Sequence, residues 1–430
     1  MSGVARLMML GGLSLATGSI SMMGCGGTGM EPLSTPKAVL ETREDSAIDG
    51  ADDRMDVYAH PDADLRDLAM RSVATMMHRR SAPTAADLYS STTLGQFENL
   101  CTTERFWNDP ILGSCTGTLI DDDLILTAGH CVSGRYDCDN KSWVFNYYRT
   151  SATTIGPISD ADVFRCKEIV HLDTAPGSDH AIIRLDRPAT PRFTPARVAY
   201  GNHAMMGGHP VAMIGSPSGT PLKIDAGGVM LSGTATDAPE ASLDAFPGSS
   251  GSGVFSRDGY ALTGVVYASG SPFYEANGTC RVAARQYYAH TQLHAMPAIL
   301  RNLCLYTPGF QSQRLCFNLK GYVEGISSGN LTGWAFDRTH PTLPVGVLAT
   351  FDKPIWDYDP STVVASGTAD ISRADVNRWY GITTGHGFSI PVPAQFWDGQ
   401  SHKVYVYATD TQPMGPIEEL SGSPYTFTLP

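Results

Sequence analysis

Residues 113–132 read GSCTGTLIDDDLILTAGHCV, and the segment Ala128-Gly129-His130-Cys131 near their end is the most informative in the chain. The apolar residues before it predict a buried β-strand, which His130 follows at once. Cys131 has a second cysteine 16 positions upstream, at Cys115. We therefore expect a Cys115–Cys131 disulfide that fixes the turn carrying the histidine. A histidine held in this way is suited to act as a general base.

A base of this kind needs a nucleophile, and the stretch DAFPGSSGSGVF supplies three candidate serines. Ser250 has a glycine two residues before it and another directly after it, so the backbone can turn tightly there. Ser249 and Ser252 are its competitors. We expect the N–H groups of Gly248 and Ser250 to form an oxyanion hole.

The stretch SDHAIIRLDRP supplies the carboxylate that would hold the imidazole in one tautomer, Asp179. The apolar residues that follow predict a buried strand, which places this carboxylate at the edge of a core. Other aspartates lie near it and make it less distinctive: Asp160, Asp162, Asp173 and Asp186. The order His, Asp, Ser resembles that of chymotrypsin-type proteins. An esterase of the α/β-hydrolase type is disfavoured, because those enzymes run Ser, Asp, His.

A chain of 430 residues is long enough for at least two domains. From Cys101 to about Leu303, short apolar runs alternate with Gly, Pro, Asn and Asp, which predicts β-barrels. A helix over 294–304 is expected to close this region. Before it, Leu65, Leu68, Ala69, Val73 and Met76 could line a helix, although Ser72–Met77 could instead be the first barrel strand.

From Gly321 the strands become rich in aromatic residues, and alternation around Val404 and Val406 predicts a β-sandwich. We expect an all-β chain, with a chymotrypsin-like double β-barrel followed by a small β-sandwich domain. The expected boundaries are a peptidase domain at 48–303, a linker at 304–320 and a β-sandwich module at 321–430.

The N-terminal residues 1–25 have one early cation and then a broken apolar stretch, which is typical of a signal peptide. Met22-Met23-Gly24-Cys25 resembles a bacterial lipoprotein cleavage box, so Cys25 is a candidate for lipidation, with a plain signal peptide as the alternative. Residues 26–47 are expected to be a tether or pro-segment. The protein is thus expected to be exported, either as a cell-envelope lipoprotein or in secreted form.

Eight cysteines remain without Cys25, an even number that suits disulfides in an exported protein. Besides the Cys115–Cys131 pair, six cysteines allow 15 connectivities, of which Cys138 with Cys166 is the one favoured. A net charge of −13 without a basic cluster excludes nucleic acid as an expected partner. No cofactor and no metal is expected, and contact with a membrane is expected only through the lipid.

The motifs IDGADDR, GSCTG, TAGHC, SDHAIIRLDRP and LDAFPGSSGSGVF resemble those of bacterial glutamyl endopeptidases and their trypsin-like relatives. The resemblance covers residues 48–303 and implies that His130 is the base, Asp179 the orienting acid and Ser250 the nucleophile. It also implies processing just before Ile48, although the stretch from Arg54 to Cys115 is longer than those enzymes have. The C-terminal stretch resembles a β-sandwich module that occurs in secreted bacterial enzymes.

The specificity pocket is expected to involve Asp244, Ala245 and Tyr267. Asp244 lies six residues before Ser250, where a pocket for basic side chains carries its carboxylate, but a structural role is the favoured alternative. Glutamyl endopeptidases use a histidine and a threonine where this chain has Tyr267 and Ala245. We therefore expect no preference for glutamate, and uncharged side chains rank above basic ones.

These observations predict a serine endopeptidase acting on protein or peptide substrates. The alternative, from another class, is an inactive protease homologue that serves as a binding module at the cell envelope. The C-terminal module is expected to dock the protein to a surface or polymer.

Overall fold

The computed structural model describes residues 48–78, 81–175, 178–200, 205–231, 239–286, 290–312, 314–355, 361–409 and 417–430. The expected signal peptide with Cys25 and the tether at 26–47 lie outside these residues. Across the described ranges, no helix combines the length and the apolar character that crossing a membrane requires.

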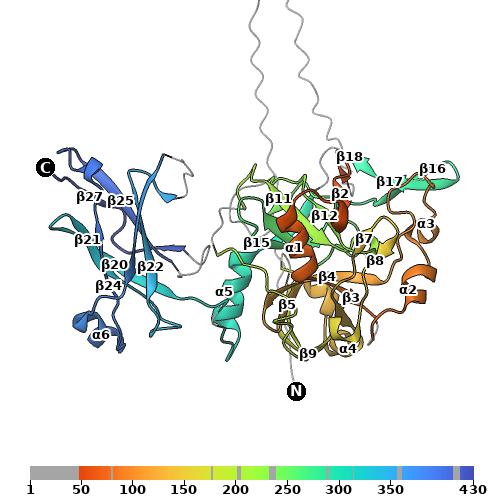
Figure 1. Ribbon diagram of the computed structural model, residues 1–430, viewed down its shortest axis with the longest axis horizontal. Helices are drawn as coiled ribbons and strands as arrows, with labels where there is room; N and C mark the ends of the chain where they lie inside the picture. The colour runs from red at the N-terminus through yellow and green to blue at the C-terminus, as the bar shows by residue number, and fades with distance from the viewer. Residues whose placement is uncertain are drawn as a thin grey trace, which may run out of the picture. The chain divides into compact units, whose positions relative to one another are not determined.

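Six antiparallel strands form a closed barrel in the order β10-β5-β4-β3-β6-β9 (Figure 1). Their bounds are β3 Val73–Met77, β4 Gly113–Asp121, β5 Leu124–Thr127, β6 Ser142–Val144, β9 Val163–Asp173 and β10 His180–Leu185. Every residue of β3 and β5 is buried. This explains why these strands are mostly apolar in the sequence, each with a single threonine.

A second sheet has seven strands in the order β13-β19-β15-β14-β11-β12-β2. The strands are β2 Arg54–Asp56, β11 Val211–Gly215, β12 Lys223–Asp225, β13 Glu240–Ala241, β14 Gly253–Ser256, β15 Leu262–Ala268 and β19 Thr291–Ala295. One hydrophobic core joins side chains of both sheets, for example Leu126 and Ile182 from the barrel with Ile214 and Val265. The predicted all-β, chymotrypsin-like double-barrel architecture is confirmed.

Both alternatives for residues 65–77 are partly right. Helix α1 (Ala63–Arg71) begins where the Asp62 side chain accepts hydrogen bonds from the N–H groups of Asp64 and Leu65, and β3 starts two residues after it ends. The long stretch before Cys115 also contains the short helices α2 (Ala85–Ser90) and α3 (Leu94–Phe97). The helix expected at 294–304 is α5 (Met296–Tyr306).

The remaining short elements of this region lie in the connections between the strands. They are helix α4 (Arg135–Asn140), the pairs β7 (Arg149–Ser151) with β8 (Thr154–Ile155) and β16 (Tyr274–Asn277) with β17 (Cys280–Ala283), and the parallel pair β1 (Ile48–Asp49) with β18 (Arg285–Gln286). Short 3₁₀ helices cover Val57–Ala59, Gly129–Val132, Asp160–Asp162 and Pro217–Gly219.

Four disulfides join Cys115 to Cys131, Cys138 to Cys166, Cys101 to Cys280 and Cys304 to Cys316. The first two are the pairs that the sequence favoured. The Cys304–Cys316 bond lies in the segment expected to be a linker. Leu315 and Cys316 are buried in the core of the double barrel, so the first part of this segment packs against that core.

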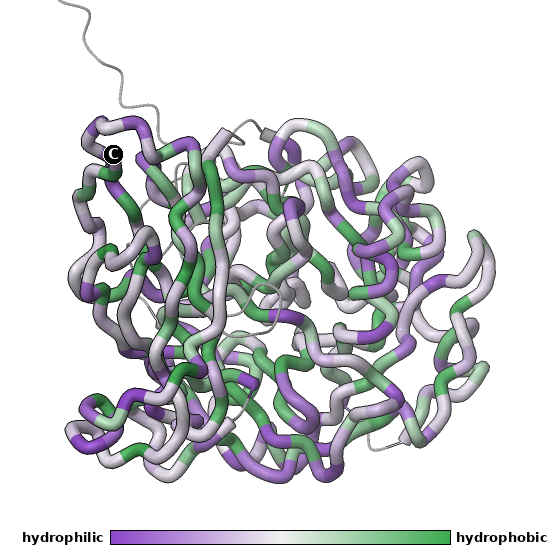
Figure 2. The backbone as a smooth tube through the Cα atoms, turned by 60° about the vertical axis from the view of Figure 1, so that its left-hand side comes forward, coloured by the Kyte–Doolittle hydropathy of each residue, from purple (hydrophilic) through white to green (hydrophobic). Residues whose placement is uncertain are grey.

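The C-terminal region forms two sheets on one core. One sheet has the order β20 (Leu319–Ser327), β21 (Asn330–Asp337) and β24 (Gly387–Pro391). The other contains β23 (Val363–Ala369), β22 (Val345–Phe351), β25 (His402–Thr409) and β26 (Ile417–Glu419), with β27 (Tyr425–Phe427) paired to β25. Side chains from both sheets share a core that includes Val404 and Val406, as expected for a β-sandwich. Helix α6 (Ala374–Tyr380) follows β23, and a short 3₁₀ helix covers Ala394–Phe396. Figure 2 shows hydrophobic and hydrophilic residues interspersed along the backbone.

Candidate active site

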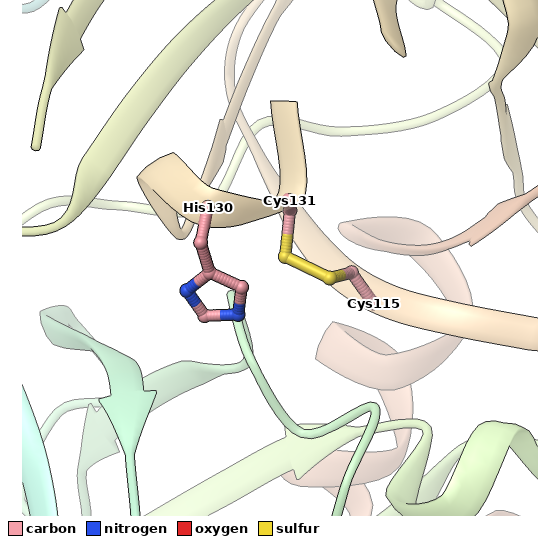
Figure 3. Close-up of side chains that lie close together, drawn as sticks. All are labelled: Cys115, His130 and Cys131. Atoms are coloured by element: carbon pink, nitrogen blue, oxygen red, sulfur yellow. A yellow bond between two sulfur atoms is a disulfide. The ribbon is translucent and has the colours of Figure 1, made fainter. Parts of the chain in front are cut away.

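His130 lies in a turn that the first barrel holds from two sides. The buried strand β5 leads into it, and the Cys115–Cys131 disulfide ties it to β4. The close-up shows the imidazole beside this disulfide (Figure 3). The side chain of His130 is 49% exposed, so the ring is available at the surface although its backbone is fixed.

Asp179 reaches His130 because β10 pairs with β5 in antiparallel register, with Ala181 opposite Thr127. Oδ2 of Asp179 lies 2.6 Å from Nδ1 of His130, and Oδ1 accepts a 2.7 Å hydrogen bond from the His130 backbone N–H. Burial by itself raises the pKa of Asp179, but the hydrogen bonds from His130 outweigh it and the pKa is lowered. The carboxylate is therefore charged at neutral pH and fixes both the ring and the backbone of the histidine.

Hydrogen bonds from Thr116 hold the Ser250 loop against β4. The N–H of Thr116 donates to the Ser250 carbonyl at 2.8 Å, and the Thr116 hydroxyl donates to the Gly248 carbonyl at 3.0 Å. Sγ of Cys131 lies 3.8 Å from the same Ser250 carbonyl oxygen. The serine thus lies next to the turn that carries His130.

The three candidate serines differ in burial. Ser249 is 1% exposed, and its hydroxyl accepts a hydrogen bond from the N–H of Phe246 at 3.2 Å. Ser252 is fully buried. Ser250 is partly exposed, and it is the member of the three whose hydroxyl could meet a substrate.

Gly248 has a φ of +90°, a conformation that favours glycine. A Cβ atom added there would lie 2.6 Å from the carbonyl oxygen of Ser216. Gly251 is equally constrained, with a φ of +83° and a Cβ position 2.0 Å from the carbonyl oxygen of Thr116. Both glycines around Ser250 are therefore required by the shape of the loop.

The carboxyl group of Asp244 is occupied by backbone contacts. Asp244 is 2% exposed and accepts hydrogen bonds from the N–H groups of Asp49 at 3.1 Å and Asp53 at 2.9 Å. Burial, and next the nearby Asp225 carboxyl, raise the pKa of Asp244 to about 8. These contacts favour the structural role for Asp244 over a role as a free charge in a pocket.

Ile48, at the expected processing site, is completely buried.

Sequence reasoning missed a histidine behind Asp179. The backbone N–H of Asp179 donates a 2.6 Å hydrogen bond to Nε2 of His294, a residue of β19 that is 5% exposed. The ring of Tyr267, expected in the specificity pocket, stacks on His294 with centroids 4.4 Å apart. Ala245, also expected there, is 1% exposed. His294 is 115 residues from Asp179 in the chain, and no local pattern links the two.

Comparison with known proteins gives one family match and likenesses to solved structures. Residues 115–265 match the family model of the trypsin-like peptidase domain. The chain carries a trypsin-like peptidase domain. The matched region begins at Cys115 and includes His130, Asp179 and Ser250, and it accounts for about a third of the 430 residues. The match supports a peptidase that acts on protein or peptide substrates.

Two solved structures are similar to the chain. One is described as a Glu endopeptidase in complex with MPD, with 18% identity over 60% of this chain and 98% of that chain, at a TM-score of 0.37. The other is the VesB protease of Vibrio cholerae, with 12% identity over 86% of this chain and 98% of that chain, also at 0.37. At these TM-scores the two likenesses carry no further conclusion. No curated protein sequence matches the chain significantly.

Proposed function

We propose that the peptidase domain is a serine endopeptidase that uses His130, Asp179 and Ser250. The observation that carries the proposal is the double hydrogen bond from His130 to Asp179. It leaves Nε2 of the imidazole as the ring nitrogen that can take a proton. The partly exposed serine beside the His130 turn is the nucleophile that fits this base.

The chemistry follows in two stages. His130 takes the proton of the Ser250 hydroxyl as the oxygen attacks the peptide carbonyl, and Asp179 stabilises the imidazolium. We assign the N–H groups of Gly248 and Ser250 to the oxyanion, where each such donor is worth about 3–4 kcal/mol in the transition state. The imidazolium then protonates the leaving amine, and water releases the acyl group from Ser250 by the same route.

Labelling with a fluorophosphonate probe, followed by peptide mapping, tests the assignment. The probe should modify Ser250, and Ser250→Ala should lose both labelling and proteolysis, with activity lower by up to about 10⁶-fold. Ser252→Ala is the matched control and should still be labelled. A wild-type protein that is folded but neither labelled nor active would favour the inactive homologue instead.

We also propose that the protein is exported and that Cys25 carries a lipid. The lipoprotein-like box before Cys25 and the four disulfides support this. The wild-type protein should enter the detergent phase in a phase-partitioning experiment, and Cys25→Ala should remain in the aqueous phase. Equal partitioning of the two proteins would contradict lipidation.

For the C-terminal region we propose docking to a surface polymer. Its exposed aromatic side chains support this, in particular Trp379 at 83% and Trp397 at 44% exposure. Co-sedimentation with insoluble cell-wall polymers tests the proposal. Trp379→Ala should weaken retention, and equal retention of the two proteins would contradict it.

A further inference from the structure

Three potential metal ligands lie on one face of the β9–β10 ladder. His171 and Asp173 are two residues apart on β9, and His180 at the start of β10 is directly opposite Asp173. Alternate residues of a strand point to the same face, as do directly opposed residues of neighbouring strands. One ligand atom from each of the three residues lies within 4.8 Å of those of the other two.

The two imidazoles have the same arrangement of partners. Nδ1 of His171 lies 3.0 Å from the Thr307 hydroxyl, and Nδ1 of His180 lies 3.3 Å from the Ser178 hydroxyl. The two Nε2 atoms are buried and have no hydrogen-bond partner in the part of the chain that the structure describes. His180 is only 2% exposed. A buried polar atom without a partner costs about 1–3 kcal/mol, so two in one place need an explanation.

We propose that His171, Asp173 and His180 bind one divalent transition metal ion, with zinc as the best fit. Two imidazole nitrogens and one carboxylate are a common zinc ligand set, and they leave a fourth position for water. A hydroxyl on the other nitrogen of each ring is the kind of outer contact that orients a metal-binding histidine. Nitrogen and carboxylate ligand atoms lie about 2.0–2.2 Å from tetrahedral zinc, so binding draws the three side chains together.

The proposed site differs from the sequence-based expectation of no metal. The sequence did not suggest it, because no recognised metal-binding motif links the three ligands. The protein also brings Cys115, His130 and Cys131 together, but the two sulfur atoms form a disulfide and cannot act as thiolate ligands.

The position of the site gives it a role distinct from catalysis. Asp173 ends β9 and His180 begins β10, so the ion ties the two ends of the loop that carries Asp179. The rings of His180 and His294 lie 5.5 Å apart, and His294 accepts the Asp179 N–H. The metal thus acts as a clamp for the loop that positions the orienting acid.

Zinc binding to the full chain tests the proposal without relying on peptidase activity. The Ser250→Ala protein prevents self-digestion and is first stripped with EDTA and dialysed. Competition with a chromophoric chelator should give one zinc ion per chain. His171→Gln and Asp173→Asn should each weaken that binding by at least about tenfold, the effect that even outer-shell changes produce. Cobalt in place of zinc should give the visible absorption of a tetrahedral site.

The matched control is His340→Gln, which removes an imidazole paired with Asp337 in the C-terminal region and should bind zinc like the parent. Circular dichroism of the metal-free proteins checks that each variant is folded. If His171→Gln does not fold, Asp173→Asn provides the test. Absence of zinc binding in the parent, or equal binding in the parent and a folded ligand variant, would overturn the proposal.

Discussion

The backbone N–H of Asp179 donates a 2.6 Å hydrogen bond to Nε2 of His294. This contact links the aspartate that holds His130 to the last strand of the second sheet, so both barrels contribute to the position of one carboxylate. Nε2 accepts the bond, which places the ring proton of His294 on Nδ1 and makes the imidazole neutral. Burial favours the same state, because it lowers the pKa of His294.

His294 is therefore expected to be a positioning residue. His294→Leu leaves the Asp179 N–H without an acceptor and should lower kcat/KM by about 10–100-fold, since small displacements of a reacting group cost rates of this order. His294→Gln offers an amide oxygen and should recover part of the loss. Steady-state kinetics on active-site-titrated protein would measure both. If the two variants were equally impaired, a loss of packing would explain the effect better than the hydrogen bond.

A second prediction concerns a buried ion cluster in the double barrel. Nζ of Lys223 lies 2.6 Å from a carboxylate oxygen of Asp56 and 2.6 Å from one of Asp109, and its side chain is 1% exposed. Lys223→Met should destabilise the protein by about 3–5 kcal/mol. It removes the cation of Asp56 and one of the two cations that pair with the buried Asp109, the other being Arg149. Urea denaturation would measure the change, with the exposed Lys320→Met as the control. A decrease of less than about 1 kcal/mol in the unfolding free energy, which is what an exposed ion pair contributes, would contradict the prediction.

The sequence predicted the fold and the three residues of the proposed triad because the information is local. The Cys115 and Cys131 spacing, the apolar run before His130 and the glycines around Ser250 each act within a short stretch. His294 and the His171–His180 cluster could not be predicted in this way. Their partners come together only through strand register and tertiary packing.

The same distinction applies to Asp244. Its place six residues before Ser250 suggests a pocket charge, but two distant N–H groups occupy its carboxyl oxygens. A sequence without an alignment cannot indicate which segment folds over a given side chain.

The third prediction is that the unfolding free energy of the protein falls as pH rises. Burial raises the pKa of Asp225 to about 6 and that of Asp244 to about 8, against 3.8 for an ordinary aspartate. Between about pH 4 and pH 6 the unfolded chain has released both protons while the folded protein holds them, and up to about pH 8 the folded protein still holds the proton of Asp244. The folded state therefore loses stability relative to the unfolded state as pH increases through this window.

Chemical denaturation at pH 5 and pH 8 would measure this dependence. Asp225→Asn removes one titrating group and should reduce the difference in unfolding free energy between the two pH values. Asp186→Asn, in an exposed turn, serves as the control and should leave the difference unchanged. An unaltered difference in Asp225→Asn would show that other groups cause the pH dependence.

The last prediction is that the peptidase does not prefer cleavage after glutamate. The sequence resemblance implies that Ala245 and Tyr267 correspond to a threonine and a histidine of glutamyl endopeptidases, and neither residue supplies a cation. The ring of Tyr267 lies against His294. Burial, and next the Asp225 carboxyl, raise the pKa of Asp244, whose oxygens accept hydrogen bonds from backbone N–H groups. An ionised glutamate entering such a pocket would lose its water without gaining donors, which costs several kcal/mol.

Two matched peptides that differ only in glutamine or glutamate at the cleavage position would isolate the effect of the charge. Cleavage after glutamine should be faster by at least about tenfold, and a peptide library should show uncharged side chains ahead of basic ones. Faster cleavage after glutamate would mean that Tyr267 does not occupy the position of the histidine in those enzymes.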